Sequence, residues 1–287
     1  MSDYYQELDA PVFDYDMHRI AGIATHRFRG PIPDLDKPYF AVVGGAQTMG
    51  RFVPHTYGQQ LAERIDLPCL NLGIGGAGPR FALRPEILHY LQRARFVIVQ
   101  APAGRSATWS LFDNTTTGRN SGRDVRTGRH LQAEEFFEEL FARQDRPLLE
   151  RFVSETRNDY AWSMQRLAQI LQPPSIMLWL SVRTPDYEIV WSRPGTVLGP
   201  YPQLVDRPTF ERFHEAFDHR VMCITSAGLP QRLWRDAPNA TVAGTTCDPD
   251  GQLWNRYYPS PEMNTAAADA LEPLCLHLRD GQRETPP

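Results

Sequence analysis

Residues 39–78 constrain the fold more than any other part of the chain, because two apolar runs there each end in glycines. Residues 39–43 form a short continuous apolar segment, as expected of a parallel strand covered on both faces, and Gly44 and Gly45 break it where a sharp turn is needed. The second run, 68–72, leads into a turn at 73–78 that holds four glycines. Glycine-rich turns at the carboxyl ends of parallel strands predict a ligand crevice.

A helix is predicted between the two turns. Pro54 suits its first turn, and an apolar residue recurs every fourth position at Tyr57, Leu61 and Ile65. Three more apolar runs, at 95–100, 175–182 and 220–225, predict strands, and helical periods lie at 84–94, 134–143, 147–171 and after Pro261. The predicted fold is therefore a three-layer α/β/α sandwich with a mostly parallel five-stranded sheet.

The domain organisation follows from where the regular spacing of apolar residues stops. Residues 1–38 have no sustained period and are expected to form an arm that packs over one domain at 39–287. That domain carries a loop-plus-helical insertion at about 103–172. Its first part, 103–130, is a long basic loop, which leaves a lid and a disordered segment as equal alternatives. Residues 241–258 are also expected to form a loop.

Composition excludes several classes of protein. A formal charge of −4 and a pI near 6.1 give no basic face for nucleic acid. No apolar run approaches the roughly 20 residues of a membrane span, and the N-terminus lacks the pattern of a secretion signal, so a cytoplasmic location is expected. The four cysteines are widely scattered, and no two of the eight histidines are four residues apart, so no metal site is expected.

The basic residues are almost all arginines. Of 30, only Lys37 is a lysine, and it precedes the first strand, away from the predicted crevice. Chemistry that needs a primary amine, such as a Schiff base to pyridoxal phosphate, is therefore improbable, and no cofactor is expected. Arg105 and Arg183 follow the third and fourth strands on the crevice side, so we expect them to bind an anion there.

Two familiar motifs are incomplete. Residues 45–52 have the glycine spacing of a phosphate loop, but Arg51 replaces its lysine and Phe52 its magnesium-binding hydroxyl. Residues 73–78 fit G-x-G-x-x-G, but Pro79 follows and the strand ending at Gln100 carries no acidic residue for a ribose. Neither a nucleoside triphosphate nor a dinucleotide is indicated.

The two turns together are similar to the first two blocks of the SGNH, or GDSL, hydrolase superfamily. The resemblance covers the sheet and its loops and implies a flavodoxin-like strand order of 2-1-3-4-5. In that superfamily the first block reads G-D-S-x-T with a serine nucleophile, the second supplies a glycine amide to an oxyanion hole, and the last is D-x-x-H. Within this type, Phe28-Arg29-Gly30-Pro31 and the segment 44–53 resemble a bacterial family of unknown function.

The catalytic residues of the superfamily are not retained. Gly44 and Thr48 match the first block, but Gly45 replaces its aspartate and Ala46 its serine. In the last block, D-x-x-H, Asn255 stands in the place of the aspartate and Tyr258 in the place of the histidine. A shifted alignment puts Asn264 in the place of the histidine instead. Losing a triad member costs about 10⁴-fold or more in rate, so the catalytic residues are unknown.

Several hypotheses therefore stay open. The first is a hydrolase or acyltransferase with a non-standard catalytic group, acting on an acyl or related ester of an anionic or carbohydrate substrate. The second is a pseudoenzyme that binds a small-molecule or glycan ligand, and sulfuryl or phosphoryl transfer is a remote third. A base within hydrogen-bond reach of a crevice hydroxyl would distinguish the first two. The substrate-binding candidates are Gly45, Ala46, Gln47, Thr48, Asn71, Gly73, Arg105, Arg183 and Tyr258.

Overall fold

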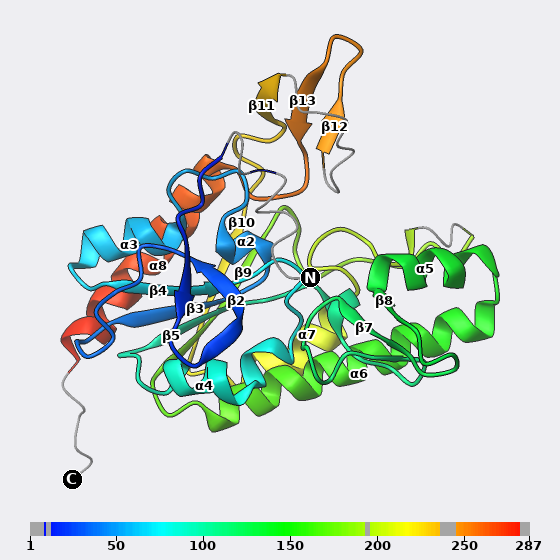
Figure 1. The fold of residues 1–287 in the computed structure, drawn as a ribbon, viewed down its shortest axis with the longest axis horizontal. Helices are drawn as coiled ribbons and strands as arrows, with labels where there is room; N and C mark the ends of the chain where they lie inside the picture. Colours follow the sequence, from blue (N-terminus) through cyan, green and yellow to red (C-terminus); the bar gives the residue numbers. More distant parts are fainter. Residues whose placement is uncertain (1–8, 10–12, 193–195, 236–244, 282–287) are drawn as a thin grey trace.

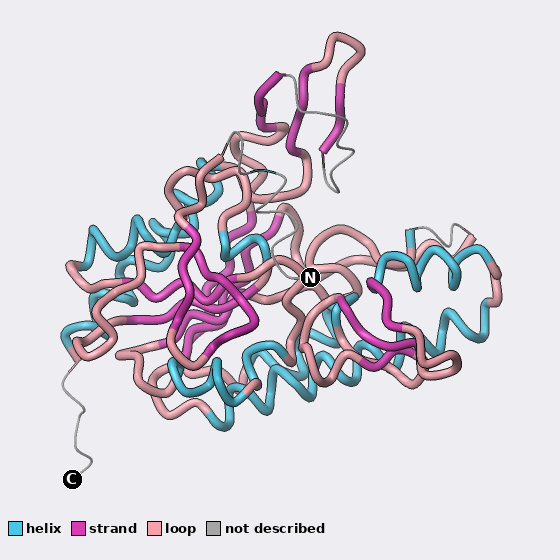
Figure 2. The backbone as a smooth tube through the Cα atoms, viewed as in Figure 1, coloured by secondary structure: helices cyan, strands magenta, loops and turns pink. Residues whose placement is uncertain are grey.

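The computed structural model describes residues 9, 13–192, 196–235 and 245–281. The described chain has three regions: an α/β body, an insertion beside it, and a small sheet that projects above both (Figure 1). In the body, helices cover both faces of the sheet (Figure 2).

The body is built on a five-stranded parallel sheet. Its strands lie in the order β10-β9-β5-β3-β4, and all four neighbouring pairs are parallel. Numbered along the chain this is the predicted order, 2-1-3-4-5, so the predicted sheet is confirmed. The strands are β3 (Phe40–Gly44), β4 (Cys69–Gly73), β5 (Val97–Gln100), β9 (Ser175–Ser181) and β10 (His219–Ile224).

The register places both glycine turns at the same edge of the sheet. Gly44 is aligned with Gly73, and Val43 is aligned with Leu72 on one side and Val99 on the other. Because all the strands are parallel, the loops that follow them meet at this carboxyl edge, which is where ligands bind in open α/β sheets.

Alternating side chains on the strands bury both faces of the sheet. In β3, Ala41 and Val43 join one core cluster and Phe40 and Val42 the other. Helices α3 (Tyr57–Ile65) and α8 (Pro261–Asp280) cover the second face, and α4 (Pro85–Leu91), α6 (Arg146–Ile170) and α7 (Arg207–His214) cover the first. Thr56 and Ser260 cap the N-termini of α3 and α8, as serine and threonine commonly do.

The N-terminal arm contains a hairpin that its sequence did not reveal. Strands β1 (Met17–Ile20) and β2 (Ile23–Arg29) pair antiparallel, and Phe28 is buried in the core of the body. Arg29 donates to the backbone carbonyls of Gly50 and Pro54. The strands are too short and too polar to show a clear period of two, and their contacts with the body hold them in place.

The long basic segment 103–130 is ordered, which corrects the expectation of a loop without structure of its own. Strands β6 (Phe112–Asp113), β7 (Ser121–Asp124) and β8 (His130–Gln132) form an antiparallel sheet beside η2 (Gly104–Ser106) and α5 (Ala133–Ala142). Buried aromatic residues, among them Trp109, Phe136 and Phe152, give the insertion its own core. Trp109 and Phe112 lie within the basic segment, and Phe136, Phe137 and Phe152 lie outside it, so no short window of sequence shows the core.

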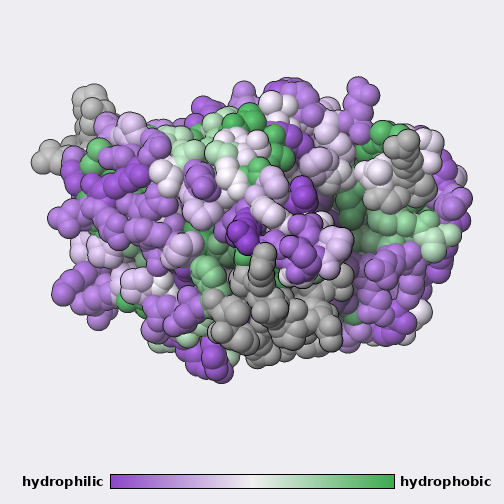
Figure 3. Space-filling view, turned by 90° about the horizontal axis from the view of Figure 1, so that it is seen from above, coloured by the Kyte–Doolittle hydropathy of each residue, from purple (hydrophilic) through white to green (hydrophobic). Residues whose placement is uncertain are grey.

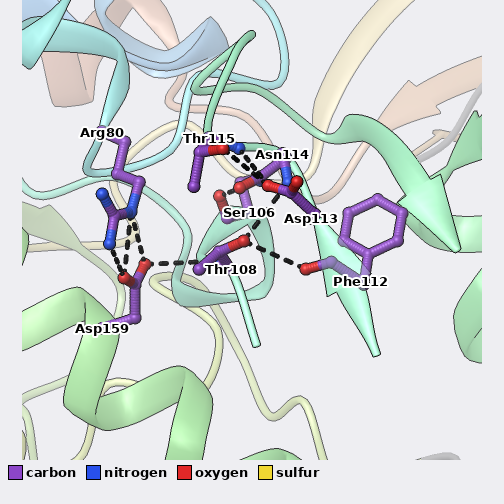
Figure 4. Close-up of polar contacts among 8 residues, drawn as sticks. All are labelled: Arg80, Ser106, Thr108, Phe112, Asp113, Asn114, Thr115 and Asp159. Atoms are coloured by element: carbon purple, nitrogen blue, oxygen red, sulfur yellow. Dashed lines mark hydrogen bonds and ion pairs between the residues drawn. The ribbon is translucent and has the colours of Figure 1, made fainter. Parts of the chain in front are cut away.

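Polar contacts tie this segment to the body (Figure 4). Asp159 of α6 accepts hydrogen bonds from the Arg80 side chain, at 2.9 Å, and from the Thr108 amide, at 3.0 Å. The Thr108 hydroxyl donates to the Phe112 carbonyl, and the Asn114 side chain donates to the Ser106 carbonyl at 2.7 Å. The segment is thus held by residues distant in sequence.

The third region is a sheet of β11 (Gln231–Arg235), β13 (Gln252–Asn255) and β12 (Thr245–Cys247), in that order. The expectation of a loop at 241–258 is therefore wrong at 245–247 and 252–255, where the chain forms strands. Residues 241–244 lie outside the described residues. The dipeptide Asp250-Gly251 between β12 and β13, with Gly251 at φ 82°, is a hairpin signal available from the sequence.

Viewed from above, the surface is mostly hydrophilic, with hydrophobic residues exposed in patches (Figure 3).

No helix in the described ranges is long and apolar enough to cross a membrane. Of the four free cysteines, Cys247 is exposed.

Candidate functional site

The short helix α2 (Ala46–Met49) lies at the carboxyl edge of the sheet and is the centre of the candidate site. It packs directly on the ends of β3 and β4, which explains two of the glycines. A Cβ on Gly44 would lie 2.3 Å from the Thr48 hydroxyl, and a Cβ on Gly73 would lie 2.3 Å from the Met49 amide nitrogen. Only glycine allows this approach without displacing the helix.

The Thr48 hydroxyl is enclosed by uncharged partners. It accepts a hydrogen bond from the Tyr57 hydroxyl at 3.2 Å and donates to Gln100 Oε1 at 3.3 Å. Thr48 is 0% exposed, and burial raises the pKa of Tyr57, so that phenol stays protonated. Gln100 in turn donates to the Tyr201 hydroxyl at 2.9 Å. Among the described residues, neither a histidine nor a carboxylate bonds to Thr48.

The space around Ala46 is filled by aromatic residues. Ala46, Phe52 and Tyr258 form one buried cluster. Arg51 is 0% exposed and forms two hydrogen bonds with the Asp9 carboxylate, at 2.8 and 3.0 Å, and one with the Tyr258 hydroxyl at 3.1 Å. The arginine in the phosphate-loop position therefore anchors the N-terminal arm. We call Ala46, Thr48, Arg51, Gln100 and Tyr258 the sealed side of α2.

Asn71 and Gly73 also serve the helix. Asn71 donates to the Thr48 carbonyl at 2.9 Å and accepts from the Gly73 amide at 2.9 Å. The amide that the SGNH resemblance makes an oxyanion donor is thus bonded to a side chain. The insertion covers the rest of that turn, where Arg119 donates to the Gly75 carbonyl at 2.7 Å.

Gln47 behaves differently from its neighbours. It is 4% exposed, and its amide forms no hydrogen bond with any described residue. It lines a cavity of about 90 Å³ between α2, the end of β9 and the segments 200–201 and 256–263. We call Gln47 and this cavity the open side of α2. Its other lining residues are Leu180, Ser181, Val182, Pro200, Tyr201, Arg256, Tyr257, Pro259 and Met263.

A second polar group adjoins the cavity at Tyr257. Its hydroxyl accepts from Gln203 Nε2 at 2.6 Å, while Gln203 Oε1 is buried with no partner within the described chain. Burial raises the pKa of Tyr257, and the nearby Arg105 opposes that shift. The Tyr257 hydroxyl therefore remains a hydrogen-bond donor at neutral pH.

The two arginines expected to bind an anion contact protein groups instead. Arg105 pairs with Glu134, which also accepts from Asn120 at 3.1 Å. Burial pushes the pKa of Glu134 upward, but Arg105 and the hydrogen bonds hold it below its usual value. Arg183 donates to the carbonyls of Pro202 and Val205, at 2.6 and 2.9 Å. The hydrogen bonds of the two arginines to described residues given above share no acceptor, and anion binding stays a prediction.

The structure brings several residues that the sequence indicated together around α2: Gly45, Ala46, Gln47, Thr48, Asn71, Gly73 and Tyr258. Their role in binding stays a prediction. The sequence did not indicate Tyr201, Gln203, Glu134 or Tyr257. Tyr201 and Gln203 lie in an irregular segment rich in glycine and proline, which carries no signal for a site, whereas Tyr257 adjoins the identified Tyr258.

Residues 4–279 match the family described as a domain of unknown function, DUF6473, and the chain belongs to that family. No curated protein matches the sequence. Among solved structures, a lipase from a goat rumen metagenome is 12% identical with a TM-score of 0.41, over 83% of this chain and 97% of that one. A gut microbial diltiazem-metabolizing enzyme is 15% identical with a TM-score of 0.31, over 65% and 37% of the two chains. Both similarities are too distant to indicate a reaction.

Proposed function

We propose that this member of the DUF6473 family is a diverged SGNH-like protein that binds a small polar ligand at the open side of α2 without turning it over. The observation that carries the proposal is the state of the former nucleophile position. Ala46 stands there, packed against Phe52 and Tyr258, and the nearest hydroxyl on the helix, Thr48, is bonded to uncharged Tyr57 and Gln100.

Ester hydrolysis needs a nucleophile and a base within hydrogen-bond reach of each other. The described residues that line the cavity offer one aliphatic hydroxyl, that of Ser181, and it donates to the Tyr201 carbonyl at 2.7 Å. Neither Ser181 nor Thr48 has a histidine or carboxylate partner among the described residues. These contacts support binding over the hydrolase and acyltransferase alternatives.

The positive support comes from Gln47. Its amide faces the cavity and bonds to no described residue, so it is available to pair with a ligand that enters there. The remote alternative of sulfuryl or phosphoryl transfer relied on free arginines, whereas Arg105 and Arg183 are engaged with protein groups.

The test uses the purified full chain in two assays. Fluorogenic acetate and butyrate esters should show no turnover above the uncatalysed rate, and a fluorophosphonate probe should not label the protein. In a thermal-shift screen of sugars, amides and carboxylates, a ligand at 100 times its Kd should stabilise the fold by about 2.7 kcal/mol. Ester turnover that is lost in Ser181→Ala or Thr48→Val, with the fold intact, would overturn the proposal.

A further inference from the structure

The chemistry of the cavity beside Gln47 restricts the ligand further, on the premise that the proposed binding function holds. Gln47 presents one carbonyl oxygen and one NH₂ group, and none of these atoms is bonded to a described residue. A group that offers both a donor and an acceptor satisfies them best. A primary or secondary amide does so, whereas an ester or a ketone offers acceptors alone.

The size of the cavity limits what can reach Gln47. Its volume of about 90 Å³ has room for a small group of a ligand. The rest of a larger ligand would lie outside it. Leu180, Val182 and Met263 contribute apolar wall, which favours a methyl group beside the polar atoms.

The charges around the cavity favour a neutral group. Among the described lining residues, Arg256 is the one cationic residue; it is exposed, and its Nε donates to the Thr246 hydroxyl at 3.1 Å. The other described lining residues are uncharged. A carboxylate placed against Gln47 would lose hydration without gaining a buried positive partner, which costs much free energy. Burying a neutral amide costs much less.

We propose that this cavity binds a neutral acetamido group, with the amide hydrogen-bonded to Gln47 and the methyl against the apolar wall. An acetamido group occurs on N-acetylated sugars and on acetylated lysine. The cavity would bind the acetamido group that both share, so experiments must distinguish the two sources.

The first experiment measures binding of small probes to the full chain by saturation-transfer NMR and calorimetry. Acetamide should bind, and acetate should bind at least tenfold more weakly. N-acetylglucosamine is compared with glucose, and Nε-acetyl-lysine with lysine. At least one acetylated member should bind more tightly than its unacetylated counterpart, and that pair identifies the source. Acetate binding as tightly as acetamide would overturn the inference.

Two variants test the role of Gln47. Gln47→Met keeps the length of the side chain and removes its amide, and it should weaken acetamide binding at least tenfold. Gln172→Met, at an exposed position beside the opposite edge of the sheet, should bind like the wild type. Thermal unfolding checks that both variants fold. Unchanged affinity in folded Gln47→Met would also overturn the inference.

The outcome separates this inference from the proposed function. If acetamide fails but another ligand in the screen binds without turnover and depends on Gln47, the acetamido assignment falls and the binding function stands. If esters are hydrolysed at the crevice, the binding function falls, and the acetamido assignment falls with it.

Discussion

Gln47 and Thr48 are neighbours on the same short helix, but only the Thr48 side chain forms hydrogen bonds with described residues. The Thr48 hydroxyl has one partner on α3 and one at the end of β5, and both are buried. The Gln47 amide has no partner among the described residues and faces a cavity. The described residues pair the polar groups on the sealed side of α2, whereas none of them pairs with the Gln47 amide on the open side.

This difference underlies the binding site that we propose. Ligands bind at the carboxyl edge of open parallel sheets, and the Gln47 amide faces a cavity there and is paired by no described residue. The sealed side, where the SGNH resemblance would put a nucleophile, is paired within the protein, so we expect it to contribute stability. Variants on the two sides should therefore separate stability from binding.

The largest effect is expected from Arg51→Met on the sealed side. The substitution leaves the buried Asp9 carboxylate without its positive partner, which typically costs about 3–5 kcal/mol. Urea unfolding followed by tryptophan fluorescence measures the change. Arg64→Met, which removes a partly exposed arginine paired with Asp269, should cost less than about 1 kcal/mol. Similar losses in the two variants would contradict a special role for the buried pair.

Adjacent glycines give the next comparison. Gly44→Ala forces a Cβ against the Thr48 hydroxyl and Gln100, and overpacking of this kind costs about 1–3 kcal/mol. Gly45→Ala brings its Cβ 2.9 Å from Gln47 Oε1, the end of a side chain that faces a cavity. Its stability should change by less than about 1 kcal/mol, while ligand binding weakens. Unfolding curves and the acetamide titration together decide this, and the comparison fails if Gly45→Ala is the less stable variant.

The two polar side chains themselves should differ in the sign of their effect. Thr48→Val removes the partner of Tyr57 and of Gln100, so stability should fall by about 1 kcal/mol. Gln47→Met removes an amide that lacks a partner, so the stability of the free protein should stay equal or rise. Thermal unfolding without ligand checks both. A loss in Gln47→Met as large as that in Thr48→Val would show that Gln47 is bonded within the protein.

The smallest effect concerns pH and the Arg105–Glu134 pair beyond Tyr257. The pKa of Glu134 is lower in the folded protein than in the unfolded chain, where it is near 4.5. Its contribution to stability is therefore present above pH 4.5 and is lost as the pH falls through the folded pKa. Glu134→Gln should flatten the stability profile in that range and leave its shape near pH 7 unchanged. Denaturation midpoints from pH 3 to 7 measure it, and an unaltered acid limb would contradict the assignment.

Much of the fold could be predicted because it rests on local patterns. Apolar runs of the expected length placed all five strands, and the glycines marked both turns at the correct edge. The small sheets at 112–132 and 231–255 could not be placed in this way. Their strands are two to five residues long and are held by contacts such as Thr108 with Asp159, far apart in sequence.

The sequence by itself determined the parallel sheet and the position of both glycine turns at its carboxyl edge. Only the tertiary structure decided which polar side chains are free to meet a ligand. Thr48 is paired with Gln100, 52 residues away, and Arg51 bonds to Tyr258 across 207 residues, whereas Gln47, next to Thr48, has no partner within the described chain. The physical reason is that a polar group's availability depends on partners brought to it by packing, and such partners are not encoded near it in the sequence.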